Sequence, residues 1–178
     1  MTTSKLYRNA TLFTALSEEV IRDGALLIEG DKISYAGPAD GAPPAAKGTE
    51  VVDAAGKYIM PGMTETHAHL SFADASPFAI GATSVEDATI TAVRNARLML
   101  DSGFTSAISF GSTYKIDVAL RNAINAGRLP GPRLLAAGRD LGATASNVDS
   151  PGGLSQIADG PGRCAKPCVN NARTTWTW

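Results

Sequence analysis

The sequence predicts an α/β fold in which a small β-rich module precedes parallel βα units. Two observations carry this prediction: residues 1–60 contain short apolar strands separated by turn residues, and residues 61–158 alternate strand and helix patterns. Because consecutive strands joined through helices run in the same direction, the second region is expected to form a parallel sheet.

Residues 1–60 are expected to form half of a small β-sandwich. The clearest signal is a hairpin, in which apolar strands over 25–29 and 32–35 flank Gly30-Asp31. Glycine and aspartate tolerate the positive φ of a tight hairpin turn. Further strands are predicted at 6–7, 11–13 and 50–53, with a loop over 41–46.

Residues 61–158 are expected to hold the first two to three βα units of a larger domain. The predicted helices are one that begins after Ser84, with Asp87 completing a capping box, and ends at Gly103, and one over 115–126 closed by Gly127. The predicted strands lie at 63–70, 104–110 and 132–137. So few units cannot close a barrel of eight.

The composition excludes several classes of protein. The chain has 178 residues and a formal net charge of −1, so it carries no excess of basic residues for nucleic acid or an anionic membrane surface. No apolar run approaches the roughly 18 residues of a membrane span, and the first residues lack the apolar core of a signal peptide. We therefore expect a cytoplasmic protein without nucleic-acid or membrane partners.

Both histidines of the chain lie in one short segment, Thr64-Glu65-Thr66-His67-Ala68-His69. In a strand, alternate side chains project from the same face, so His67 and His69 are expected together, roughly 7 Å apart along the chain. Two neutral imidazoles at that spacing can bind one metal ion. The same alternation places Glu65 on their face. The alternative is a pair of histidines that is hydrogen-bonded at a strand end and binds no metal.

The segment around the histidines resembles the amidohydrolase superfamily. Its members typically carry a Pro-Gly pair, two hydrophobic residues, an aspartate and then His-x-His. This chain has Pro61-Gly62 followed by Met63-Thr64-Glu65-Thr66-His67-Ala68-His69, in which Glu65 replaces the aspartate. Residues 103–106 and 125–133 resemble the branch of imidazolonepropionase-like and Xaa-Pro dipeptidase-like enzymes. The resemblance covers residues 5 to about 158, the N-terminal portion of such an enzyme.

This resemblance implies the N-terminal part of a (β/α)8 TIM barrel, preceded by the β-sandwich module. It implies one or two divalent metal ions, with zinc expected, held by His67 and His69 and supported by Glu65. The implied reaction is hydrolysis of a C–N bond in a small-molecule amide, peptide-like or cyclic amide substrate by a metal-activated water. Ser109, at a strand end, and Asn147, in a following loop, are candidate substrate contacts.

The family's other metal ligands, a carboxylated lysine or glutamate and two more histidines, have no counterpart in this sequence. We therefore expect a truncated hydrolase that is inactive alone. Two alternatives stay open: a non-catalytic small domain with a structural or adventitious metal site, and a fragment that completes its barrel with another polypeptide. The unpaired parallel strand edge and the uncovered apolar helix faces of such a fragment also predict aggregation, with an oligomer as one of the forms it can take.

Residues 159–178 form a tail unlike the rest of the chain. Both cysteines and both tryptophans lie within residues 164–178. One interpretation is a zinc site that pairs Cys164 and Cys168 with the histidines. The other, which we favour, is that the chain is read out of frame from about residue 161.

Overall fold

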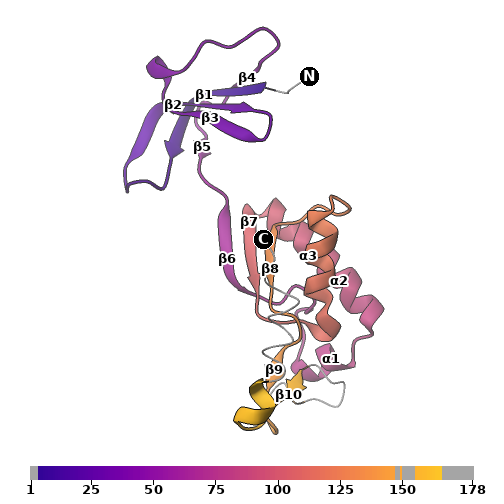
Figure 1. Ribbon diagram of the computed structural model, residues 1–178. Coiled ribbons are helices and arrows are strands. Elements are labelled where there is room, and N and C mark those ends of the chain that lie inside the picture. Colours follow the sequence, from indigo (N-terminus) through magenta and orange to yellow (C-terminus); the bar gives the residue numbers. More distant parts are fainter. Residues whose placement is uncertain (1–3, 147–148, 150–154, 166–178) are drawn as a thin grey trace. The chain divides into compact units, whose positions relative to one another are not determined.

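The computed structural model describes residues 4–146, 149 and 155–165. The chain divides into two compact units, Met1–Pro61 and Gly62–Trp178 (Figure 1). None of the helices in the described parts of the chain is long and apolar enough to cross a membrane. Residues 161–165 are helical, whereas the rest of the predicted tail, from residue 166 onward, lies outside the described residues.

The first unit is one mixed sheet in the order β3-β2-β1-β4, with β5 also paired to β1. The antiparallel strands are β1 (Ser4–Phe13), β2 (Val20–Glu29) and β3 (Lys32–Pro38), whereas β4 (Glu50–Asp53) and β5 (Tyr58–Ile59) run parallel to β1. A short 3-10 helix, η1 (Ala39–Gly41), follows β3. The described residues of this unit form a single sheet, so the second sheet of a sandwich stays a prediction.

The hairpin predicted around Gly30-Asp31 is confirmed. Glu29 pairs with Lys32 across the turn, and Gly30 has a φ of 65°. The prediction of separate strands at 6–7 and 11–13 is wrong, because both segments belong to β1. The register of β1 against β2 shifts between Tyr7 and Ala10, and Asn9 has a φ of 63° there. A bulge therefore interrupts the pattern of one strand without ending it.

The second unit contains a parallel sheet in the order β6-β7-β8, formed by β6 (Met63–Ala68), β7 (Phe104–Ser109) and β8 (Arg133–Ala136). Helices α2 (Val85–Asp101) and α3 (Ile116–Asn125) lie on one side of it (Figure 1). The core between sheet and helices is built from small and aliphatic side chains, Leu70, Ala88, Ala92, Ala96, Ala107, Ile116, Leu120 and Leu134. The predicted parallel βα arrangement is thus confirmed for these three strands.

Helix α2 begins and ends where the sequence predicts. The Ser84 hydroxyl accepts a hydrogen bond from the Asp87 N–H (3.1 Å) and donates one to the Asp87 carboxylate (2.9 Å). Beyond the helix, Gly103 has a φ of 88°, a conformation that glycine adopts without steric cost. These local signals set the first and last residues of α2, the helix that connects β6 to β7.

Four short elements of the second unit are not predicted from the sequence. Helix α1 (Pro77–Ala82) begins after Ser76, whose hydroxyl accepts from the Ala79 N–H. The 3-10 helix η2 (Thr113–Lys115) precedes α3, and β9 (Leu141–Gly142) pairs in parallel with β10 (Gln156–Ile157). Apart from α1, these elements lie in the segments that follow β7 and β8.

Candidate metal centre

The candidate metal centre lies at the carboxyl ends of the parallel strands. His67 is near the end of β6, and His69 follows that strand directly. Phe110 follows β7, and its N–H donates to the Ala68 carbonyl (3.0 Å). Parallel strands present their carboxyl ends at one edge of the sheet, which is where α/β proteins commonly place their ligand sites. Residues distant in the sequence therefore meet around the two histidines.

The structure brings His67 and His69 together, as the sequence predicts. Their ring centroids are 5.3 Å apart and their planes make an angle of 63°. Each imidazole also stacks on a phenyl ring: His67 lies 4.4 Å from Phe110 and His69 lies 4.7 Å from Phe72, centroid to centroid, with nearly parallel planes. The two aromatic neighbours restrict how each imidazole can rotate.

The proton position on His69 follows from its hydrogen-bond partner. Its Nδ1 atom lies 3.1 Å from the Gly111 carbonyl oxygen. Because a carbonyl oxygen can only accept, Nδ1 carries the hydrogen in this contact, and in the neutral ring the lone pair is then on Nε2. Metal-binding histidines commonly donate their other ring N–H to a backbone carbonyl in this way. His69 is therefore arranged as an Nε2 ligand.

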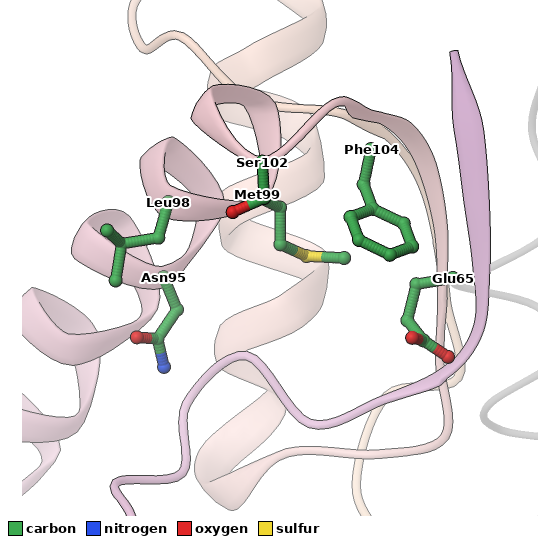
Figure 2. Close-up of a pocket in the computed structure, with 6 residues that line it drawn as sticks. All are labelled: Glu65, Asn95, Leu98, Met99, Ser102 and Phe104. Atoms are coloured by element: carbon green, nitrogen blue, oxygen red, sulfur yellow. The ribbon is translucent and has the colours of Figure 1, made fainter. Parts of the chain in front are cut away.

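Glu65 contacts the site through the backbone of His67. Its Oε1 accepts a hydrogen bond from the His67 N–H (2.9 Å). Its side chain points toward α2 and lines a pocket of about 280 Å3 together with Asn95, Leu98, Met99, Ser102 and Phe104 (Figure 2). The carboxylate can thus fix the main chain at His67 from the helix side of the sheet.

The strict alternation predicted over residues 63–70 is wrong. Glu65 pairs with Ala107 and Ala68 pairs with Ser109, so three steps along β6 oppose two along β7. This irregularity falls between Glu65 and Ala68 and includes His67. The side chain of Glu65 is directed to α2 as a result, although simple alternation would place it on the face of both histidines.

The predicted substrate contacts have different outcomes. Ser109 is buried, with 1% of its surface exposed, and its hydroxyl lies 3.4 Å from both the N and the O of Gly111. This hydroxyl supports the backbone that holds His69, and its contact with a substrate stays a prediction. Asn147 lies outside the described residues.

The segments after β7 and β8 are held together by a buried carboxylate that the sequence did not reveal. Asp117 is 1% exposed and accepts hydrogen bonds from the Ser112 hydroxyl (2.9 Å), the Val118 N–H (2.8 Å) and the Gly138 N–H (3.0 Å). Nearby, Tyr114 and Lys115 adopt positive φ angles of 53° and 61°. Non-glycine residues at positive φ carry backbone strain, which is often found close to functional sites.

A second residue missed from the sequence anchors the chain beyond His69. The Asn95 side-chain amide on α2 donates to the carbonyl oxygens of Leu70 (2.8 Å) and Phe72 (3.1 Å). Phe72 is the ring that stacks on His69, so Asn95 connects α2 to the surroundings of the candidate ligand. The sequence signal for this role is that Asn95 is a polar residue on the side of an amphipathic helix that faces the core.

The donor set of the site fits a divalent metal of intermediate softness. Neutral imidazole nitrogens are common ligands of zinc and related ions, and here one of the two rings is already fixed in a suitable tautomer. In the part of the chain that the structure describes, no group of three His, Cys, Asp or Glu side chains could hold a metal ion. Cys164 is exposed, and its thiol donates to the Ala158 carbonyl (3.4 Å), whereas Cys168 lies outside the described residues.

The fold is shared with solved amidohydrolase structures. The chain superposes on a crystal structure of an amidohydrolase with a TM-score of 0.78 and 25% identity, covering 97% of this chain and 45% of that one. Its TM-score against the ochratoxinase of A. niger is 0.79, with 21% identity, 98% of this chain and 45% of that one. The chain thus spans less than half the length of these proteins.

Sequence comparison gives shorter matches to curated proteins. An imidazolonepropionase of Arthrobacter sp. (strain FB24) is 39% identical over 72 residues, which is 36% of this chain and 17% of that protein. A 5-methylthioadenosine/S-adenosylhomocysteine deaminase of Symbiobacterium thermophilum is 47% identical over 51 residues, 29% of this chain and 12% of that protein. The matched segments are therefore small parts of those proteins.

The family model described as "Amidohydrolase family" matches residues 58–176. This match contains the His67/His69 segment and the whole β6-β7-β8 sheet. It also continues beyond residue 158, where the resemblance was expected to end. Because the match covers more than half of the sequence, the chain belongs to the amidohydrolase family.

Proposed function

We propose that this chain is part of a metal-dependent hydrolase that cleaves a C–N bond in a small-molecule amide, peptide-like or cyclic amide substrate. The observation that carries the proposal is the pair of imidazoles at the carboxyl ends of parallel strands, with ring centroids 5.3 Å apart. Membership of the amidohydrolase family supports the class of reaction. The sheet β6-β7-β8 would then be the first three strands of a (β/α)8 barrel, and the first unit would be half of a β-sandwich.

In this proposal His67 and His69 hold a divalent metal, with zinc expected from the imidazole donors. When bound, such an ion supplies a Lewis acid and lowers the pKa of a bound water toward neutrality. The protein's own contribution is to fix the ligands. The Gly111 carbonyl holds Nδ1 of His69, so that Nε2 is presented, and Glu65 holds the main chain at His67.

Two histidines are an incomplete ligand set for catalysis. A catalytic zinc site usually has three protein ligands and one open position, and this sequence contains two histidines in total. We therefore expect the chain to bind a divalent metal without turning over a substrate. Hydrolysis would require further ligands and a general acid/base, supplied by another polypeptide or by a longer form of the chain.

Metal analysis of the purified chain tests the ligand assignment. After equilibration with Zn2+ and removal of the excess, plasma mass spectrometry should detect bound zinc in the wild type. The His67→Ala/His69→Ala variant should lose this zinc, whereas Cys164→Ser/Cys168→Ser, the matched control for a cysteine site, should keep it. Equal zinc content in the wild type and the histidine variant would overturn the assignment, and loss in the cysteine variant would favour the cysteine pair.

A further inference from the structure

The carboxyl ends of β6, β7 and β8 bring an acidic residue next to the histidine pair. Asp140 lies four residues after β8, in a segment that continues the parallel pairing: the Ser112 N–H donates to the Gly138 carbonyl (2.9 Å), and Ser112 forms an isolated bridge with Arg139. The Asp140 carbonyl in turn accepts from the Gln156 N–H (2.7 Å). The main chain at Asp140 is thus fixed on both sides.

Gly111 is the contact between Asp140 and His69. A Cβ atom on Gly111 would lie 2.7 Å from Oδ1 of Asp140, so the carboxylate occupies the space that the glycine leaves. The carbonyl oxygen of the same glycine accepts from Nδ1 of His69 (3.1 Å). One residue therefore touches both the candidate ligand and the carboxylate.

The electrostatic environment of Asp140 also includes the histidine pair. Burial raises the pKa of its carboxyl group above the usual range, and the neighbouring Asp117 acts in the same direction. The His69 imidazole and, more weakly, the His67 imidazole lower this pKa, as does a hydrogen bond from the Leu141 N–H. A cation bound by the rings would add to that effect.

We propose that Asp140 is a positioning residue of the metal centre, whose carboxylate provides negative charge beside a divalent cation bound by His67 and His69. This inference rests on the proposed function. Two neutral imidazoles bring no charge to compensate a divalent ion, and a carboxylate in a partly buried position attracts it more strongly than one in water. Asp140 acts across space, since it does not form a three-ligand group with the histidines in the described residues.

The test is a titration of the full chain with Co2+, followed by its absorption bands, and with Zn2+ in competition. Asp140→Asn keeps the shape of the side chain and an acceptor for the Leu141 N–H but removes the charge. Its dissociation constant for Zn2+ should rise about tenfold at low salt. Asp101→Asn is the matched control: it makes the same change in charge at the end of α2, near the amino end of β7, and should change the constant less than about twofold.

Two further measurements separate an electrostatic role from a structural one. Asp140→Glu, which keeps the charge, should bind Zn2+ within about threefold of the wild type. The wild-type affinity should fall with added salt more steeply than that of Asp140→Asn. Without metal, Asp140→Asn should unfold in urea at the same or a higher midpoint than the wild type, because a partly buried charge has been removed.

The outcomes distinguish this inference from the function on which it rests. Equal Zn2+ affinities in the wild type and Asp140→Asn would overturn the role of Asp140 and leave the histidine site intact. The role of Asp140 would also be overturned if Asp140→Glu bound Zn2+ as weakly as Asp140→Asn does. Zn2+ binding that does not depend on His67 and His69 would overturn the proposed function itself.

Discussion

The imidazole of His67 lies flat against the phenyl ring of Phe110, with centroids 4.4 Å apart and an angle of 1° between the planes. His67 lies in β6 and Phe110 directly follows β7, and the two segments are hydrogen-bonded at this level through the Phe110 N–H and the Ala68 carbonyl (3.0 Å). Phe110 is 50% exposed, and the His67 imidazole stacks on one face of its ring. Here the ring serves as a platform for a candidate ligand.

Replacing this platform should weaken metal binding. Phe110→Leu keeps an apolar side chain but removes the stacked ring, so His67 gains rotational freedom that metal binding must remove. Stacked aromatic pairs contribute about 0.5–1.5 kcal/mol beyond their buried area, and we expect the Zn2+ dissociation constant to rise about three- to tenfold. A competition titration with a chromophoric chelator measures this change.

Phe72→Leu is the matched control for Phe110→Leu. Phe72 stacks on His69 at 4.7 Å, but His69 is also held by the Gly111 carbonyl, so removal of this ring should have the smaller effect. A larger loss of affinity in Phe72→Leu than in Phe110→Leu would contradict the assignment of Phe110 as the main restraint on the His67 ring.

Glu65 should act through its hydrogen bond to the His67 N–H and not through its charge. Glu65→Gln keeps an oxygen acceptor at the same distance along the side chain, whereas Glu65→Ala removes it. We expect the alanine variant to bind Zn2+ about fivefold more weakly than the wild type, and the glutamine variant to stay within about twofold. If both variants lose affinity equally, the charge of Glu65 is the property that matters.

Elements that are marked by caps or turn residues close in the sequence could be predicted, whereas features that depend on how strands pair could not. Ser84 and Gly103 mark the ends of α2, and Gly30-Asp31 marks the hairpin, since each depends on residues close in sequence. The bulge at Asn9 and the irregularity in β6 depend on the neighbouring strand. Helix α1 begins with an N-cap serine and a proline, Ser76-Pro77, which is a local signal for the start of a helix.

In the candidate site, too, the contact between residues close in the sequence could be predicted, whereas contacts between different strands could not. His67 and His69 are two residues apart, so their proximity could be predicted from strand geometry. Phe110 and Asp140 reach them only because β6, β7 and β8 are adjacent and parallel. Nothing in the sequence near Asp140 indicates histidines more than 70 residues earlier in the chain. Residues that support a site from other strands emerge only from the fold.

The pH dependence of stability should contain a contribution from Asp53 in the first unit. The Asn9 side-chain amide (2.9 Å) and then the Ala55 N–H (3.0 Å) donate to its carboxylate and lower its pKa below the ordinary 3.8. A pKa lowered in the folded state stabilises the protein above the ordinary value, and this contribution disappears as the pH falls through the folded-state pKa. The free energy of unfolding should therefore decrease on acidification below about pH 4.

Asn9→Gly isolates this contribution. Glycine accepts the φ of 63° at this position but lacks the amide that donates to Asp53. Urea unfolding between about pH 2.5 and pH 5 should show a smaller acid-dependent loss of stability in Asn9→Gly than in the wild type. Identical pH profiles would mean that the Asn9 hydrogen bond does not shift the Asp53 pKa in solution.

Gly111 should be the glycine at which an added methyl group affects both folding and metal binding. It has a φ of 131°, and a Cβ would lie 2.7 Å from Oδ1 and 2.8 Å from Cα of Asp140. Gly127, at the end of α3, has a φ of 68° but no atom within 4 Å of an added Cβ, so Gly127→Ala tests backbone strain alone. We expect Gly127→Ala to lower the free energy of unfolding by about 1 kcal/mol and Gly111→Ala by about 2–4 kcal/mol.

Gly111→Ala should also weaken metal binding more than Gly127→Ala does. In Gly111→Ala the segment after β7 must move away from Asp140, which displaces the carbonyl that fixes Nδ1 of His69. Zn2+ binding should therefore weaken by about tenfold or more, while Gly127→Ala keeps the wild-type affinity. Urea unfolding and Zn2+ titration of both proteins measure the two effects. Of the two variants, only Gly111→Ala displaces the Gly111 carbonyl. Equal Zn2+ affinities in the two variants would therefore show that this carbonyl does not orient His69.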